Sequence, residues 1–200
     1  MTAPPAPARP SRAFSLAWLM ATAFVKTRLS AVLAFPLAVL MLAPYAIRGQ
    51  LYETPQGDGM VIFGRYRVVV EFLIVAVMMV PLFAVYVWIF EVHGFGWATT
   101  YWAVLMFLLL AGATALGQGS MTLPTGRETP RGRRWQVAAL AQRPGTRLSA
   151  VQMALRLRDT LPPGAVLVAS AASDELVRKY EQLGFTEGKN RRVYWISPGV

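Results

Sequence analysis

Apolar residues are concentrated in three long runs within the first two thirds of the chain, at 29–47, 68–92 and 97–117. The first and third runs contain no charged residue, and the second has one carboxylate near each end. Because a membrane-spanning helix needs about 20 mostly apolar residues, each run predicts a span. The first run also contains Pro36 and Pro44, which transmembrane helices tolerate but which often kink them.

Residues 1–28 predict a disordered tail rich in proline and alanine, followed by a short helix in the membrane interface. The apolar run at 14–25 is too short to span, and Lys26 and Arg28 separate it from the next run. A cleaved secretory signal is the alternative, because a basic start followed by an apolar run has that form. The two basic residues interrupt such a signal, so we expect the interfacial helix.

The distribution of lysine and arginine predicts how the last two spans are oriented. Their link at 93–96 has no basic residue, whereas Arg65 and Arg67 precede the second run and four arginines follow the third. The positive-inside rule therefore places both ends of this hairpin in the cytoplasm. Three spans would put the basic amino terminus outside, a conflict that disappears if 29–47 is re-entrant or interfacial. We expect an integral protein of the plasma (inner) membrane with a cytoplasmic carboxy-terminal region.

Glu71 lies near the start of the second apolar run. An ionisable residue within a span is costly and usually marks a functional site. The residue is only about one turn from the predicted interface, so snorkelling of the side chain or protonation would also avoid a buried charge.

Two segments rich in turn-forming residues separate the apolar runs from each other and from the rest of the chain. Residues 48–67 contain Pro55 and several glycines and predict a turn-rich connection. Residues 118–134 predict a basic linker and a domain boundary. We expect the arginines from Arg127 to Arg134 to lie against anionic head groups of the bilayer, which attract each of them by about 1 kcal/mol. No aromatic residues are interleaved with these arginines, which argues against a nucleic-acid site.

Composition agrees with a membrane protein: 55% of residues are hydrophobic, 15% are charged, and the mean hydropathy is +0.42. The net charge is +10, and 13 of the 20 basic residues fall within 127–200. The absence of cysteine excludes disulfides, zinc–thiolate sites, iron–sulfur clusters and a cysteine nucleophile. With His93 as the single histidine, a multi-histidine metal site is excluded too, and no metal is expected.

The carboxy-terminal region, residues 135–200, predicts strands alternating with helices. The expected elements are a strand at 135–141, a helix at 147–161, a strand at 165–169, a helix from Ser173 or Asp174 to Leu183, and a strand at 192–196. Gly184 follows the second helix, as expected for its C′ residue. This order predicts an α/β layer.

Residues 176–185, LVRKYEQLGF, combine a helix with a tyrosine followed three residues later by Gly-Phe. Together with the flanking strands, they resemble the carboxy-terminal half of a GNAT-type N-acetyltransferase domain over residues 135–196. The resemblance implies that 135–141 and 165–169 are the family's fourth and fifth strands, which hold the pantetheine arm of acetyl-CoA in a V-shaped gap. It also implies that Tyr180 protonates the departing CoA thiolate.

The resemblance further implies a loop that binds acetyl-CoA at the start of the first helix of this region. Its residues are Arg147, Leu148, Ser149, Ala150, Val151 and Gln152. Backbone N–H groups at a helix amino terminus cradle a diphosphate, and glycines let the backbone approach closely. Ala150 and Gln152 stand where the family's pattern has glycine or another small residue, so the loop departs from that pattern.

The family's first half, with its early strands and two helices, has no soluble counterpart in this interpretation. We therefore expect an α-helical membrane domain (29–117, two or three spans) plus a small α/β GNAT-like (acyl-CoA N-acyltransferase) half-domain at 135–200. A second copy or another chain would complete the half-domain. Three functions follow as hypotheses: a membrane-anchored N-acetyltransferase that uses acetyl-CoA, a non-catalytic membrane protein whose GNAT-like module mediates an interaction, and a small transporter or channel component.

Overall fold

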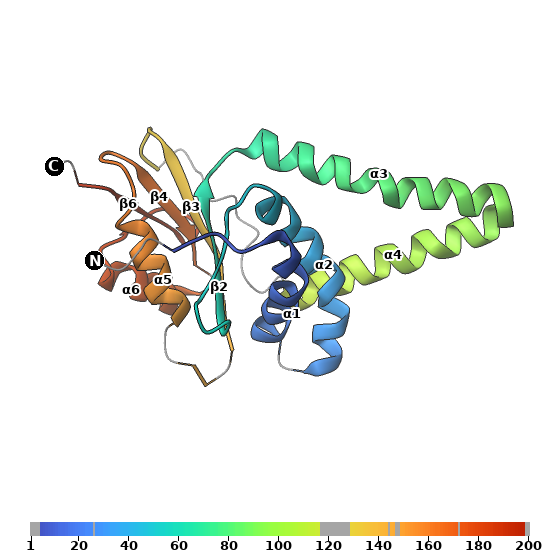
Figure 1. The fold of residues 1–200 in the computed structure, drawn as a ribbon, viewed down its shortest axis with the longest axis horizontal. Coiled ribbons are helices and arrows are strands. Elements are labelled where there is room, and N and C mark those ends of the chain that lie inside the picture. The colour runs from blue at the N-terminus through green and yellow to red at the C-terminus, as the bar shows by residue number, and fades with distance from the viewer. Residues whose placement is uncertain are drawn as a thin grey trace.

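A mixed sheet of six strands lies between two pairs of helices, and a long helical hairpin projects away from it (Figure 1). The computed structural model describes residues 5–25, 27–116, 129–143, 145–146, 149–171 and 173–198. The elements are η1 (Pro10–Arg12), α1 (Ala13–Phe24), α2 (Arg28–Ile47), β1 (Leu51–Glu53), β2 (Gly59–Arg65), α3 (Val68–His93), α4 (Phe95–Leu116), β3 (Arg134–Gln142), α5 (Ser149–Arg158), β4 (Val166–Ser170), α6 (Asp174–Gln182), β5 (Thr186–Glu187) and β6 (Arg192–Ile196).

The strand order is β1-β2-β3-β4-β6-β5, with β3 and β4 parallel and every other neighbouring pair antiparallel. Strands β1 and β2 come from residues 48–67, so the prediction of a turn-rich connection there is correct for 54–58 and wrong for the two strands that flank this turn. The physical reason is burial on both faces of β2: Met60 and Ile62 belong to the core on one side of the sheet, and Val61 and Phe63 to the core on the other. A strand covered on both faces is a continuous apolar run rather than an alternating one.

Helices α1 and α2 cover one face of the sheet. Leu16 and Met20 of α1 and Leu42 of α2 are buried there together with Met60 and Ile62 of β2. The predicted interfacial helix is thus α1, and its inner face is part of a protein core. Figure 1 shows that α2 crosses the hairpin at the end next to the sheet and does not run alongside α3 and α4.

Helices α5 and α6 cover the opposite face, and the ends of α6 agree with the sequence prediction. The Ser173 side chain caps α6 by accepting a hydrogen bond from the Leu176 N–H. Gly184 has φ +85°, and the N–H groups of Gly184 and Phe185 donate to the carbonyls of Glu181 and Tyr180. These two hydrogen bonds form a Schellman motif, which turns the chain sharply into β5.

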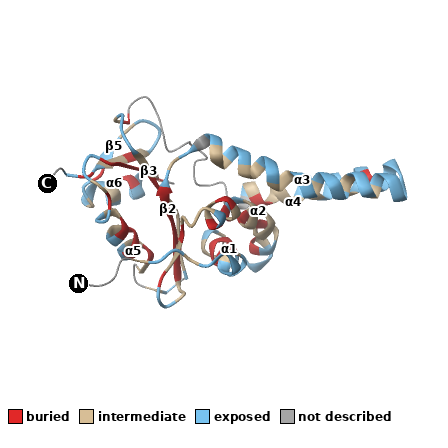
Figure 2. Cartoon of the chain, turned by 45° about the horizontal axis from the view of Figure 1, so that its top comes forward, coloured by how far each residue is buried: buried red, intermediate tan, exposed pale blue. Residues whose placement is uncertain are grey.

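The projecting hairpin consists of α3 and α4, joined at Gly94, and it is inserted between the adjacent strands β2 and β3. The helices contain 26 and 22 residues, which at roughly 1.5 Å per residue is about 39 and 33 Å, enough to cross a hydrocarbon core of about 30 Å. Figure 2 shows mostly exposed residues along its outer part. With α2, the described chain has three helices long and apolar enough to cross a membrane, which supports a membrane protein.

The sheet joins residues from both sides of the boundary predicted at 118–134. Residues 118–128 of that boundary lie outside the described residues. Strand β2 pairs with β3 from Gly59↔Gln142 to Arg65↔Trp135. The α/β part is therefore larger than the expected half-domain of three strands, because α1, α2, β1 and β2 belong to it. Strand β2 of the same chain pairs along β3.

Candidate functional site

The parallel strands β3 and β4 part soon after they begin. Their paired residues are Arg134↔Val166, Trp135↔Leu167 and Gln136↔Val168. Beyond Gln136, β3 continues to Gln142 and β4 to Ser170 without pairing to each other. Ala139 of β3 has φ +46°, and the register between β2 and β3 shifts opposite it, between Met60 and Ile62. This bulge bends β3 where it leaves β4.

Side chains from four elements fill the space between the parting strands. They line a cavity of about 20 Å³, which has room for about one water molecule. The lining residues are Val137, Leu140, Val151, Ala154, Leu155, Arg158, Leu167, Tyr180, Leu183 and Phe185. The cleft is closed in this structure by aliphatic and aromatic side chains.

Tyr180 reaches this cavity from α6. Its ring packs edge-on against Phe185 with centroids 5.2 Å apart, and its hydroxyl has no hydrogen-bond partner within the described part of the chain. Burial raises the pKa of the Tyr180 phenol above its ordinary value, because the anion would lose its hydration. The side chain is therefore protonated at neutral pH, and it is a weaker acid than a solvent-exposed tyrosine.

The predicted loop residues take different positions at the start of α5, and Arg147 and Leu148 lie outside the described residues. The Ser149 hydroxyl is buried without a hydrogen-bond partner in the part of the chain that is described. Ala150 is buried against β2, where a Cβ added to Gly59 would lie 3.2 Å from that of Ala150. Val151 lines the same cavity as Tyr180, whereas Gln152 is exposed outside it.

Arg158 is held by contacts within the protein. Its guanidinium carbon lies 5.0 Å from the ring centroid of Trp195, and its Nη1 donates to the Leu183 carbonyl at 2.9 Å. Its Nε donates to the Asp159 carboxylate at 3.2 Å. This arginine fixes α5 against β6 and the end of α6 and is not available to an anion.

A second polar cluster joins the foot of α3 to the rest of the protein. Glu71 Oε1 accepts from Arg48 Nη1 at 3.0 Å and from Gln136 Nε2 at 3.1 Å, and Oε2 accepts from the Tyr45 hydroxyl at 3.1 Å. Sequence analysis identified Glu71 but none of these partners. The ion pair with Arg48 compensates the charge of the carboxylate, and these contacts connect α2, α3 and β3 through Glu71.

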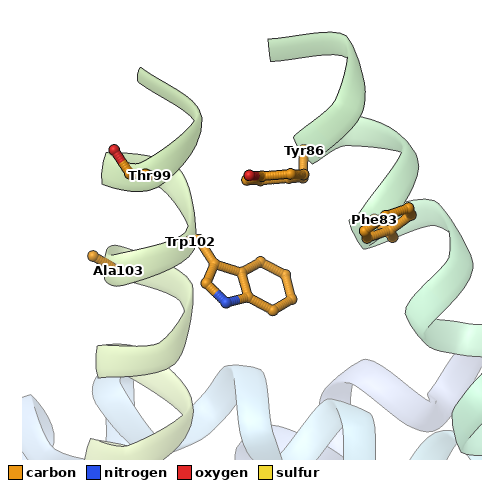
Figure 3. A pocket seen from close by; sticks show the side chains of 5 residues that line it. All are labelled: Phe83, Tyr86, Thr99, Trp102 and Ala103. Carbon is orange, nitrogen blue, oxygen red and sulfur yellow. The ribbon is translucent and has the colours of Figure 1, made fainter. Parts of the chain in front are cut away.

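A third feature is an apolar pocket of about 470 Å³ between α3 and α4. Figure 3 shows Trp102 reaching from α4 toward Tyr86 and Phe83 on α3. The rings of Tyr86 and Trp102 meet edge-on at 5.8 Å. The Thr99 hydroxyl donates to carbonyls of its own helix, so this pocket presents an apolar surface within the hairpin.

The three features differ in the chemistry they offer. The cleft has the Tyr180 phenol at its side and the buried Ser149 hydroxyl near the start of α5, whereas Glu71 is engaged by its neighbours. Among the residues that the structure describes, no group of three histidine, aspartate or glutamate side chains could hold a metal ion. Comparison of the chain with protein-family models, curated proteins and solved structures finds no match.

Proposed function

We propose that the protein is a membrane-anchored N-acetyltransferase of the GNAT type, which takes acetyl-CoA between β3 and β4. The observation that carries this proposal is the parting of the only parallel strand pair in the described sheet after three residue pairs. Two further features support it. Helices α1 and α2 and the antiparallel strands β1 and β2 precede β3 and belong to the same α/β part, and Tyr180 lies on α6 beside the gap.

The residues at the start of α5 fit the phosphates of acetyl-CoA, whereas the side chains between β3 and β4 must move to admit its pantetheine arm. Near the start of α5, the buried Ser149 hydroxyl and free helical N–H groups suit a phosphate. Between the strands, the cavity of about 20 Å³ is too small for a pantetheine arm. Binding therefore requires side chains that line the cavity, such as Leu140 of β3 and Leu155 of α5, to move.

Acetyl-CoA would supply an acyl group activated as a thioester, and Tyr180 would supply a proton. The acceptor amine attacks the carbonyl carbon with its lone pair, and the carbon–sulfur bond breaks with its electron pair moving to sulfur. The sulfur takes the proton of the Tyr180 hydroxyl, which general acid catalysis requires to be held within reach. The amine releases its proton to solvent, and Tyr180 regains one.

The closed cleft favours a second candidate, a non-catalytic GNAT-like module that serves an interaction. In that case, the side chains that fill the gap are a permanent core. Ala150 packed against Gly59 fits this alternative, because it leaves little room for a phosphate beneath the backbone. A transport function is not proposed, since Glu71 is held by Arg48.

Binding and turnover of acetyl-CoA by the full-length protein in detergent micelles separate the two candidates. Calorimetry measures binding, and a thiol reagent measures CoA release with a panel of primary amines; the chain has no cysteine to react with that reagent. We expect Tyr180→Phe to keep binding and to lower turnover by about 10² to 10⁴-fold. The matched control is Tyr52→Phe, because Tyr52 also packs edge-on against a phenylalanine, Phe63.

The expected pattern is loss of turnover in Tyr180→Phe alone. Absence of acetyl-CoA binding at millimolar concentration would leave the non-catalytic module as the function. Equal turnover in both variants and in the unmodified protein would show that Tyr180 is not the general acid.

A further inference from the structure

An arginine-lined hollow lies at the foot of the hairpin, where β2 leads into α3. It has a volume of about 720 Å³ and is lined by Arg65, Tyr66, Arg67, Arg131, Gly132, Arg133 and Arg134. The two lining segments are far apart in sequence but adjacent in space, because β2 and β3 pair at Arg65↔Trp135 and the Tyr66 N–H donates to the Arg134 carbonyl at 3.1 Å.

Among the residues that the structure describes, none neutralises the positive charge of this hollow. No acidic residue lines it, and none of the guanidinium groups of Arg65, Arg67, Arg131 and Arg133 forms an ion pair within the described ranges. Arg134 donates to the carbonyls of Thr129 and Pro130, which leaves its charge uncompensated. Clustered arginines without counter-ions repel one another, so an anion that enters the hollow is stabilised by all of them.

The amino terminus of α3 adds to the positive potential, because the carboxylate of Glu71 in its first turn is already paired with Arg48. Arg67 is the N-cap residue of this helix of 26 residues and makes no side-chain capping hydrogen bond. The first N–H groups of a helix carry a partial positive charge that favours anions. The hollow therefore combines a helix amino terminus with several uncompensated guanidinium groups.

The position of the hollow identifies the source of the anion. Val69 and Phe72, in the first turns of α3, are 71% and 73% exposed, so the apolar surface of the hairpin begins directly beside Arg67. If the hairpin crosses a bilayer, the hydrocarbon boundary falls at these residues and the lipid phosphates lie at the level of the hollow. A volume of 720 Å³ is within the range of about 300 to 1,000 Å³ typical of small-molecule sites.

We propose that this hollow is a binding site for the phosphodiester head group of one anionic phospholipid. The site differs from a general attraction of basic residues to the bilayer, because two segments converge on one concave space. Arginine binds phosphate through two parallel hydrogen bonds, a geometry that lysine cannot reproduce. The proposal is independent of the proposed acetyl-CoA site, which is formed by β3, β4 and the start of α5.

The test uses the full-length protein in neutral detergent, titrated with dioleoylphosphatidylglycerol or dioleoylphosphatidylcholine, with bound lipid counted by native mass spectrometry. The site variant carries Arg67→Gln and Arg133→Gln. The control variant carries Arg156→Gln and Arg178→Gln, two exposed arginines on α5 and α6, and loses the same charge. A third variant carries Arg67→Lys and Arg133→Lys and keeps the charge.

We expect the first phosphatidylglycerol to bind about thirtyfold more weakly to the site variant, from about 1 kcal/mol for each arginine. The control variant should bind as the unmodified protein does, and the lysine variant should lie between. Equal weakening in the site and control variants, full affinity in the lysine variant, or equal binding of phosphatidylcholine would each overturn the proposal. Displacement of the lipid by inorganic phosphate or by an RNA oligonucleotide at a lower concentration than the lipid would overturn it as well.

Discussion

Replacing Glu71 tests whether side-chain contacts hold the hairpin against the sheet or whether only the chain connections join the two. Glu71→Gln removes the charge that Arg48 pairs with and leaves at most one carbonyl oxygen for three donors: Arg48, Gln136 and the Tyr45 hydroxyl. The Gln136 side chain is buried within the sheet. Donors left without an acceptor in a buried position cost stability, because they lose hydration without compensation.

The magnitude follows from how far the pair is buried. The side chains of Arg48 and Glu71 are 12% and 18% exposed, so solvent reaches the ion pair only in part. Breaking a fully buried pair costs about 3 to 5 kcal/mol. With partial exposure and one hydrogen bond retained, we expect Glu71→Gln to cost about 2 to 3 kcal/mol. For a chain of this length, that lowers the midpoint of thermal unfolding by roughly 4 to 12 °C.

The assay is thermal unfolding of the full-length protein in detergent, followed by circular dichroism. The matched control is Glu175→Gln, which breaks the Lys179–Glu175 pair of α6, whose side chains are 60% and 75% exposed. An exposed pair of this spacing contributes about 0.3 to 0.5 kcal/mol, so the control should shift the midpoint by about 2 °C or less. Indistinguishable shifts in the two variants would refute the argument that Glu71 fixes the hairpin.

Two further substitutions probe helix packing and capping by the same assay. A Cβ added to Gly112 of α4 would lie 2.9 Å from the Cβ of Leu37 in α2, so Gly112→Ala should lower the free energy of unfolding by about 1 to 3 kcal/mol. A Cβ added to Gly96 meets no atom within 4 Å, so Gly96→Ala should be neutral or should stabilise the protein by up to about 1 kcal/mol. A loss of stability in Gly96→Ala alone would contradict this packing. Ser173→Ala removes the cap of α6 and should cost about 1 kcal/mol; an unchanged midpoint would show that the cap is dispensable.

Long apolar runs and helix ends were predictable because their signals are local. The two runs that form the hairpin are continuous in sequence, and α3 and α4 begin and end within two residues of the predicted bounds. The cap at Ser173 and the C′ residue Gly184 depend on neighbours within a few positions. Such features need no knowledge of distant segments.

The strands β1 and β2 were not predicted because glycine occurs both in turns and at positions where two segments pack too closely for a side chain. Turn formation was inferred from the glycines of 48–67, yet a Cβ at Gly64 would lie 2.3 Å from the Gln50 side chain, and one at Gly59 would lie 3.0 Å from Thr54. These two glycines allow close packing within the hairpin of β1 and β2. The buried run Met60–Phe63 between them was the available signal for a strand covered on both faces.

The partners of Glu71 could not be predicted, because they lie 23 to 65 residues away in the chain. A carboxylate near a span boundary is compatible with snorkelling, protonation or pairing. Only the fold decides among these, by placing the end of α2 and the start of β3 beside the foot of α3.

The same contacts determine how the sheet is held relative to the hairpin. Because β2 and β3 are adjacent antiparallel strands, a short turn could join them, and the inserted hairpin leaves their pairing intact. Both feet of the hairpin are anchored, α3 through Glu71 to β3 and α4 through Gly112 to α2. The arginine-lined hollow and the start of β3 therefore lie at the foot, whereas β3 ends near α5, where the Arg143 N–H donates to Asp58 in the turn between β1 and β2. A head group in the hollow and a ligand at the start of α5 would thus occupy opposite ends of one strand, so neither would block the other.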